Sequence, residues 1–298
     1  MRVIARSSGC AVALLLAGTA ALAAPAAAQA SIPGGTVVPC SSSALVTAIQ
    51  RANSARFATL VLSRGCNYVL TMAAAPNDGL PPVTGNLVIL GSGGTTISRS
   101  SSAGKFRIFD VPGRLVLANV TVANGNSGNE VGGGIIDDDG TLVLRNVRLT
   151  GNTAPSGGGL AVLNGGRATV SFSVLDGNNA TGFTGGAIDI NSGDLVVDHS
   201  RVTGNTAHLD GGGVATNSPS TTRITGTVVA RNVAGRVGGG IVNGATMVLR
   251  GDRVVFNRAG SGGGGIFNDG TLSLLFTLVA FNSPDNCSPQ GTIRGCRH

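Results

Sequence analysis

Short runs in which apolar and polar side chains alternate recur through the second half of the chain. Three examples are Asp138–Arg145, Asn191–Asp198 and Asn268–Leu275, each of which opens with a turn and continues as an alternating segment. Alternation places every second side chain on one face, which is the period of a β-strand. Because Asn and Gly tolerate a positive φ, the opening residues predict a tight turn before each strand.

A longer module contains these strands. It consists of an apolar residue, two variable residues and Asn, followed by a short loop and a Gly-Gly motif that leads into an aliphatic residue. Successive asparagines of the module are 26, 27, 27, 25 and 25 residues apart. The asparagines are Asn152, Asn178, Asn205, Asn232, Asn257 and Asn282, and the aliphatic residues are Ile135, Leu160, Ile188, Val214, Ile241 and Ile266. The module predicts a repeat protein.

The length of the module favours one architecture. About three short strands fit into 25 to 27 residues, and they bury their apolar faces only against the same strands of the next repeat. We therefore expect an all-β fold, a single-stranded right-handed parallel β-helix of roughly eight coils spaced about 4.8 Å apart. The aliphatic residues would form an interior ladder, and the asparagines a second ladder joined by side-chain amides. A β-propeller needs longer repeats, and a leucine-rich horseshoe needs a Leu-x-x-Leu-x-Leu frame that the chain lacks.

The two ends of such a stack need caps, because exposed strand edges promote aggregation. Three serines precede Ala44–Asn53, in which Leu45, Ile49 and Ala52 share one helical face. This pattern predicts a short N-terminal capping helix with Ser as its N-cap. The predicted organisation is a signal peptide at 1–30, an N-terminal cap at 31–85, the β-helix at 86–282 and a C-terminal tail at 283–298.

The composition agrees with a β-structure rich in turns. Glycine accounts for 48 of the 298 residues, whereas aromatic residues make up 3%. Glycine costs roughly 1 kcal/mol at an interior helical position, so a helical bundle is excluded. The apolar share of 42% is enough for a core, which excludes disorder driven by charge.

The first thirty residues have the features of a signal peptide. Arg2 and Arg6 precede an apolar stretch from Ala11 to Leu22, and Ala28–Ala30 forms a small-residue cleavage motif. We therefore expect a protein secreted by a bacterium, with no transmembrane segment in the mature chain. Cell-surface association is compatible with this destination.

The charge pattern argues against a nucleic-acid partner. The formal charge of the whole chain is +7, and loss of Arg2 and Arg6 with the signal peptide would reduce it to +5. The basic residues are almost all Arg and are spread singly, without interleaved aromatic residues. A nucleic-acid-binding face would instead concentrate them.

Four cysteines would remain after cleavage, at opposite ends of the chain. Cys40 and Cys66 form one local pair, and Cys287 and Cys296 form the other. Four cysteines allow three disulfide connectivities. The short C-x-x-C spacing of a zinc site is absent, and an oxidising compartment favours disulfides. We expect the two local pairs to be disulfide-bonded.

The repeats resemble those of the chlamydial polymorphic outer membrane proteins, which share the Gly-Gly-Gly-Ile and apolar-x-x-Asn motifs. More closely, the chain resembles secreted bacterial right-handed parallel β-helix repeat proteins of the pectate-lyase-like superfamily. This second similarity extends to Val38–Cys40, Gly65–Tyr68, Gly79–Asn86 and Asp285–Cys287. The resemblance implies the fold, whereas function depends on individual sites.

The resemblance also implies where catalytic residues would lie. Lyases and hydrolases of the superfamily act on acidic polysaccharides with carboxylates on adjacent coils, which bind calcium or serve as acid and base. The weak candidates here are Asp137, Asp138, Asp139 and Asp189. Inverting hydrolysis needs carboxylates about 6.5–9.5 Å apart, and calcium needs about six or more oxygen ligands. Asp138 also occupies a turn position that Asn holds in other repeats, which favours a structural role.

The remaining polar and aromatic candidates have simpler interpretations. We expect His199, His208 and His298 to be surface residues. The isolated arginines either solubilise the strands or line a groove for an anionic glycan; they are Arg145, Arg148, Arg201, Arg250 and Arg253. The phenylalanines at strand positions are assigned to the core; they are Phe172, Phe256, Phe276 and Phe281.

The sequence therefore favours a secreted, non-catalytic β-helix with a structural or adhesive role at the cell surface or in the extracellular matrix. No cofactor is expected, and the partner would be a cell-wall or extracellular polysaccharide or a surface protein. The alternative is a polysaccharide lyase, a glycoside hydrolase or a glycan-binding module of the pectate-lyase-like type. Only this alternative would use Ca²⁺.

Overall fold

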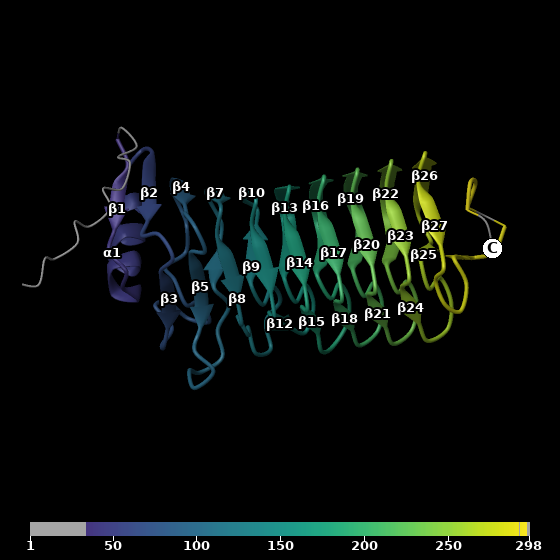
Figure 1. Cartoon of the computed structure of the whole chain (residues 1–298), viewed down its shortest axis with the longest axis horizontal. Coiled ribbons are helices and arrows are strands. Elements are labelled where there is room, and N and C mark those ends of the chain that lie inside the picture. The colour runs from purple at the N-terminus through teal and green to yellow at the C-terminus, as the bar shows by residue number, and fades with distance from the viewer. Residues whose placement is uncertain (1–33, 292, 297–298) are drawn as a thin grey trace, which may run out of the picture. The chain divides into compact units, whose positions relative to one another are not determined.

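The computed structural model describes residues 34–291 and 293–296. The predicted signal peptide and the terminal His298 lie outside these residues. The described chain forms an all-β, parallel β-helix of the right-handed type with about nine turns and one short helix, as the repeat length predicted. Figure 1 shows the coils stacked side by side from helix α1 to the C-terminal strands.

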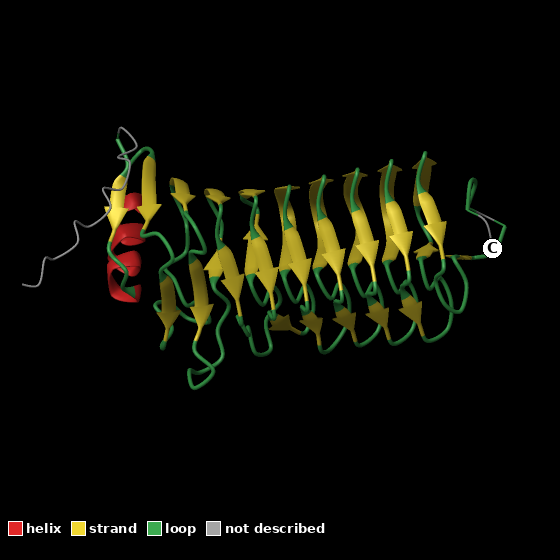
Figure 2. Ribbon diagram, in the orientation of Figure 1, coloured by secondary structure: helices red, strands yellow, loops and turns green. Residues whose placement is uncertain are grey.

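Three parallel sheets run along the stack, and Figure 2 shows their strands as successive arrows. The largest sheet contains 14 strands: β1 (Thr36–Val38), β2 (Ala58–Leu62), β4 (Asn86–Leu90), β6 (Phe109–Asp110), β7 (Arg114–Ala118), β9 (Ile135–Asp138), β10 (Thr141–Arg145), β13 (Leu160–Ser171), β16 (Ile188–Asp198), β19 (Val214–Thr225), β22 (Ile241–Arg250), β25 (Ile266–Asn268), β26 (Thr271–Leu275) and β28 (Cys287–Ser288).

The other two sheets close each coil. The second sheet has nine strands: β3 (Asn67–Leu70), β5 (Thr96–Arg99), β8 (Thr121–Ala123), β11 (Arg148–Thr150), β14 (Val174–Asp176), β17 (Arg201–Thr203), β20 (Val228–Ala230), β23 (Arg253–Val255) and β27 (Leu278–Ala280). The third has five short strands: β12 (Thr153–Ala154), β15 (Asn179–Ala180), β18 (Thr206–Ala207), β21 (Val233–Ala234) and β24 (Arg258–Ala259).

Aliphatic side chains at matching positions stack into a continuous interior column. Ile135 pairs with Leu160, Leu160 with Ile188, and the register continues to Ile266 without a shift at this position. Every member of this column has an exposed fraction of 0%. Each repeat thus buries its apolar face against the next one, which is why a single repeat is not a folding unit.

A second interior column consists of the repeated asparagines. The Asn152 Nδ2 amide donates to Asn178 Oδ1 at 3.0 Å, and the same bond joins each following pair as far as Asn282. Each Oδ1 also accepts the backbone N–H of the preceding asparagine. The amides from Asn152 to Asn257 are buried, so these bonds satisfy polar groups that would otherwise cost about 1–3 kcal/mol each.

A third column was not predicted. Ser173, Ser200, Thr227, Asp252 and Thr277 follow one another between the first and second sheets, and each side-chain oxygen accepts the backbone N–H of its predecessor. The Asp252 carboxylate also accepts from the Arg250 backbone N–H at 2.7 Å. Burial raises the pKa of Asp252 to about 6.

The Gly-Gly motifs lie at corners where neighbouring coils approach closely. Gly157 has a φ of +61°, a conformation that favours glycine. A Cβ atom on Gly158 would lie 2.6 Å from the Gly186 backbone oxygen in the next coil. Side chains are therefore excluded from these corners by the backbone of the next coil.

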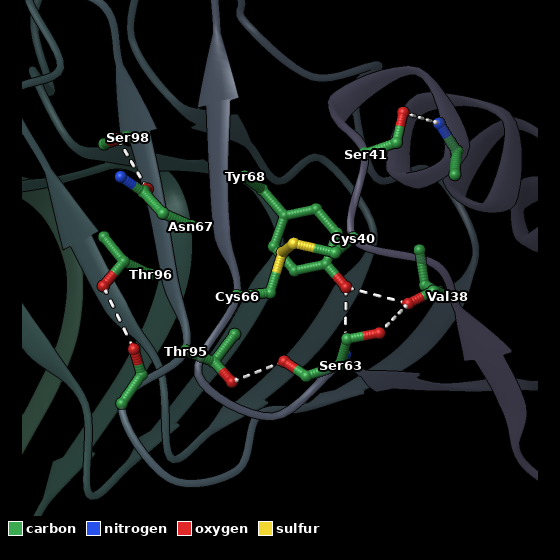
Figure 3. The surroundings of a disulfide bond; sticks show 12 residues. Val38, Cys40, Ser41, Ser63, Cys66, Asn67, Tyr68, Thr95, Thr96 and Ser98 are labelled. Carbon is green, nitrogen blue, oxygen red and sulfur yellow. Dashed lines mark hydrogen bonds between the residues drawn. A yellow bond between two sulfur atoms is a disulfide. The ribbon is translucent and has the colours of Figure 1, made fainter. Parts of the chain in front are cut away.

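Helix α1 (Ser42–Asn53) covers the N-terminal coil. The Ser41 hydroxyl accepts the Ala44 backbone N–H as its N-cap, and Leu45, Ile49 and Ala52 are buried. The Cys40–Cys66 disulfide fastens the helix to the coil, and Figure 3 shows Tyr68 beside it. The Tyr68 hydroxyl donates to the Val38 carbonyl at 2.8 Å and accepts the Ser63 backbone N–H at 2.9 Å.

The stack extends beyond the region in which the repeat is clear. Strands β2 and β3 already pair in register with β4 and β5, so the coils begin upstream of residue 86. At the other end the Cys287–Cys296 disulfide closes a short loop, and Cys287 and Ile293 are buried. Both cysteine pairs are therefore bonded as predicted.

Candidate functional site

The four candidate carboxylates do not form one site. Asp137 follows Ile135 on the inward face of β9 and is fully buried, in register with Val162 and Ile190 of the next two coils. Neither of its carboxylate oxygens has a hydrogen-bond partner of good geometry among the described residues. Burial raises the pKa of Asp137 to about 7, although the backbone amides of Arg167 and Gly140 partly lower it.

Asp189 lies on the opposite face of the same sheet. It is two coils away from β9 and in register with Ala161 and Ile136. Its Oδ1 atom accepts the Thr184 hydroxyl at 2.8 Å, and burial raises its pKa to about 6. Because consecutive residues of a strand point to opposite faces, the sheet separates Asp189 from Asp137.

Asp138 is the last residue of β9, and Asp139 begins the turn that follows it. The Asn164 side-chain amide donates to Asp138 at 2.6 Å, and Asp139 is exposed with a φ of +59°. The two residues thus have structural roles at the end of the strand and in the turn. Among residues 34–291 and 293–296, no group of three or more His, Cys, Asp or Glu side chains is placed to hold a metal ion.

A buried ion pair near the N-terminal coils was missed by the sequence analysis. Arg107 Nε lies 2.9 Å from Asp78 Oδ1, and both side chains are 8% exposed. Burial raises the pKa of Asp78 to about 6, while Arg107 lowers it. Burial also raises the pKa of the neighbouring Asp110. These residues belong to irregular coils in which no repeat signal marks them.

The candidate arginines point outward and are exposed. Arg148 makes a bidentate ion pair with Asp176 of the next coil, at 2.8 and 2.7 Å. In a pair of this geometry the carboxylate neutralises the guanidinium, which is then less available to an anionic ligand.

Each coil turns a corner where a strand of the first sheet ends and the chain enters the second sheet. The residues at these corners form a further column, here called the first corner column. Its members succeed one another coil by coil, and each of the first six donates its backbone N–H to the next coil. All have a positive φ, between 45° and 68°. They are Asn119, Asn146, Phe172, His199, Gly226, Gly251 and Phe276.

A second corner column follows the second sheet and has the same backbone conformation. Asn or Gly occupies its first four positions, but the last three hold Arg231, Phe256 and Phe281. The two rings stack with centroids 5.3 Å apart, and the Arg231 guanidinium carbon lies 5.9 Å from the centre of the Phe256 ring.

The assignment of the four phenylalanines to the core was therefore wrong. Phe172 and Phe276 are 64% and 93% exposed, and Phe256 and Phe281 are 52% and 72% exposed. Each phenylalanine comes two residues after an inward position of the preceding strand, so the alternation of the strand predicts that its side chain also points inward. The left-handed backbone at the corner ends the alternation and turns the ring outward.

His199 shares this arrangement with Phe172. Their rings stack with centroids 5.5 Å apart and an interplanar angle of 20°. His199 Nδ1 lies 2.9 Å from the Asp198 carboxylate, which fixes the orientation of the imidazole. The expectation that His199 is a surface residue is confirmed, but its aromatic partner was not predicted.

Comparisons with protein-family models, with curated proteins and with solved structures find no match for this chain. No helix in the described part of the chain combines the length and hydropathy needed to cross a membrane. Interpretation of the site therefore depends on its own geometry.

Proposed function

We propose that this protein is an exported, non-catalytic β-helix that acts as a structural or adhesive element at a bacterial cell surface or in the extracellular matrix. We also propose that it belongs to the pectate-lyase-like superfamily, which its repeats resemble. A cell-wall or extracellular polysaccharide, or a surface protein, would be its partner.

The support for export comes from the two ends of the stack. Cys40–Cys66 fastens the capping helix and Cys287–Cys296 closes the C-terminal loop. Structural disulfides persist in oxidising compartments. The predicted signal peptide at 1–30 points to the same destination.

One observation carries the adhesive role: aromatic rings stack on the outside of the coil, at positions where the backbone favours Gly or Asn. Phe172 stacks on His199, and Phe256 stacks on Phe281. A bulky residue in the left-handed region costs about 1–3 kcal/mol. Exposed rings that lower the stability of the fold are best explained by contact with a partner.

The test is retention of the processed protein on isolated bacterial cell surfaces. We expect the wild-type protein to be retained, and variants with Phe172→Asn and His199→Asn, or with Phe256→Asn and Phe281→Asn, to be retained less. A parallel screen for cleavage of acidic polysaccharides, with and without calcium, should detect no new chain ends. Calcium-dependent cleavage would contradict the non-catalytic role, and equal retention of all variants would contradict the adhesive one.

A further inference from the structure

A groove runs beside the first corner column, across successive coils. It has a volume of about 550 Å³ and lies between the Ser92–Thr95 turn, Asn119, Asn146 and Phe172. Arg148 and Val174 form part of its lining from the second sheet. The Phe172–His199 stack continues the column into the following coil.

The polar groups of the groove are oriented before any ligand arrives. The Asn146 Nδ2 amide donates to Asn119 Oδ1 at 2.8 Å. This bond orients both amides and leaves the Asn119 NH2 group as a donor and the Asn146 carbonyl oxygen as an acceptor for a ligand. A ligand with hydroxyl groups can use both, since a hydroxyl donates and accepts.

The ring of Phe172 is also held in place. The backbone at Phe172 has a φ of +51°, and the stacked imidazole restricts the ring on its other side. Such a ring offers a flat apolar face at low entropic cost, because little freedom remains to be lost on binding. Apolar C–H faces of a pyranose match this surface, and its equatorial hydroxyls match the amides.

The charges argue for an uncharged ligand. Arg148 is neutralised by its bidentate pair with Asp176, and Asp198 lies against His199. A polyanion with one carboxylate per sugar would need a cation at each coil, whereas these coils present two amides and a phenyl ring.

The spacing of the coils fits a polymer. Adjacent parallel strands lie about 4.8 Å apart, which is close to the length of one pyranose unit in an extended chain. Because Phe172 stacks on His199 of the following coil, the free face of its ring points back along the column toward Asn146. A chain laid along the column would therefore place successive sugar units over Asn119 and Asn146 and end against the Phe172 ring.

We propose that this groove binds a neutral polysaccharide chain along the coil axis, with Phe172 as its stacking platform and Asn119 and Asn146 as its hydrogen-bonding groups. The proposal rests on the adhesive function proposed above and names the class of partner. It differs from the acidic polysaccharides that the resemblance implied.

The test uses the processed full-length chain and calorimetric titration with hexasaccharides. The neutral probes are cellohexaose, laminarihexaose, maltohexaose and xylohexaose, and the anionic probe is hexagalacturonate. We expect at least one neutral probe to bind more tightly than hexagalacturonate, with little dependence on salt. Phe172→Asn and Asn146→Ala should each weaken that binding by about tenfold or more.

Phe276→Asn is the matched control. Phe276 occupies the same column with the same left-handed backbone, but it lies outside the groove. Its replacement should leave binding within about twofold of wild type. Thermal unfolding of each variant separates loss of a contact from loss of the fold.

The outcomes separate this proposal from the function on which it rests. Absence of binding to every neutral probe, or equal effects of Phe172→Asn and Phe276→Asn, would overturn the proposal that this groove is the binding site. Preferential, salt-sensitive binding of hexagalacturonate would overturn its neutral character. If either result appears while cell-surface retention still depends on the corner aromatics, the adhesive function stands without the proposed ligand.

Discussion

The asparagine ladder and the first corner column contrast two kinds of constraint within the same coils. The ladder repeats one residue from Asn152 to Asn282, and its side-chain amides bond continuously along the interior. The corner column repeats only a backbone conformation, and its side chains range from Gly226 to Phe276. An interior position must satisfy buried polar groups in every coil, whereas an exposed corner must satisfy only its φ. Chemical variety therefore collects at the corners, where a partner can reach it.

The largest expected effect comes from interrupting the ladder. Asn205 accepts from the backbone and side chain of Asn178 and donates to Leu175 and Asn232. Asn205→Ala should lower the free energy of unfolding by about 4 kcal/mol, because it leaves several buried groups unpaired. Chemical denaturation measures this loss. The control is Asn146→Ala at the exposed corner, and a similar loss there would remove the distinction between the two columns.

Loss of the N-terminal disulfide should have the next largest effect. Cys40 and Cys66 are 26 residues apart, against 9 for Cys287 and Cys296. The loop-entropy relation gives about 3.5 kcal/mol for the first bond and about 2.5 kcal/mol for the second. Paired Cys→Ser variants, compared by their denaturation midpoints, should follow this order. The reverse order would indicate that the disulfide of the C-terminal loop stabilises the stack more than the disulfide beside helix α1.

The buried carboxyl groups predict a pH dependence that the exposed corners lack. The folded pKa of Asp137 is raised from 3.8 to about 7, so the native state binds its proton more tightly than the unfolded state does. This contribution to stability is complete below pH 3.8 and is lost as the pH rises through about 7. Asp189 and Asp252 act in the same direction, with pKa values raised to about 6.

Asp137→Asn removes this titration while keeping the shape of the side chain. We expect it to raise the free energy of unfolding at pH 8 by on the order of 2 kcal/mol and to flatten the fall between pH 4 and pH 7. Asp139→Asn, at the exposed turn, is the control and should change neither. A wild-type stability that rises with pH over this window would contradict the buried, protonated state of Asp137.

The smallest effect concerns strain at the corner. Phe276 has a φ of +53° and is almost fully exposed. Phe276→Asn should stabilise the protein by about 1 kcal/mol, because Asn tolerates the left-handed region. The reciprocal change Asn146→Phe should destabilise it by a similar amount. Calorimetric melting curves measure both, and a loss of stability in Phe276→Asn would mean that the exposed ring contributes to packing.

The predictable part of the candidate site follows from the period of the strands. Asp137 is two residues after the inward Ile135, so its burial can be read from alternation. Its apolar surroundings cannot be read in this way, because Val162 and Ile190 come from other coils. The hydroxyl column through Ser173 and Ser200 was missed for a related reason: Ser, Thr and Asp replace one another there, so no single residue marks the repeat.

The sequence by itself determined the coil, its aliphatic and asparagine columns and its two disulfides, because these features repeat one kind of residue at one spacing or pair cysteines locally. Only the tertiary structure decided which side of the coil the phenylalanines face. Because the Val170 side chain points inward, alternation predicts the same direction for Phe172. The left-handed backbone at Phe172 instead turns its ring outward. The stacking of Phe172 on His199 joins residues 27 positions apart in sequence that only the register of β13 and β16 brings together. A local pattern fixes the period of a strand, whereas the direction of a corner side chain depends on how the coil closes.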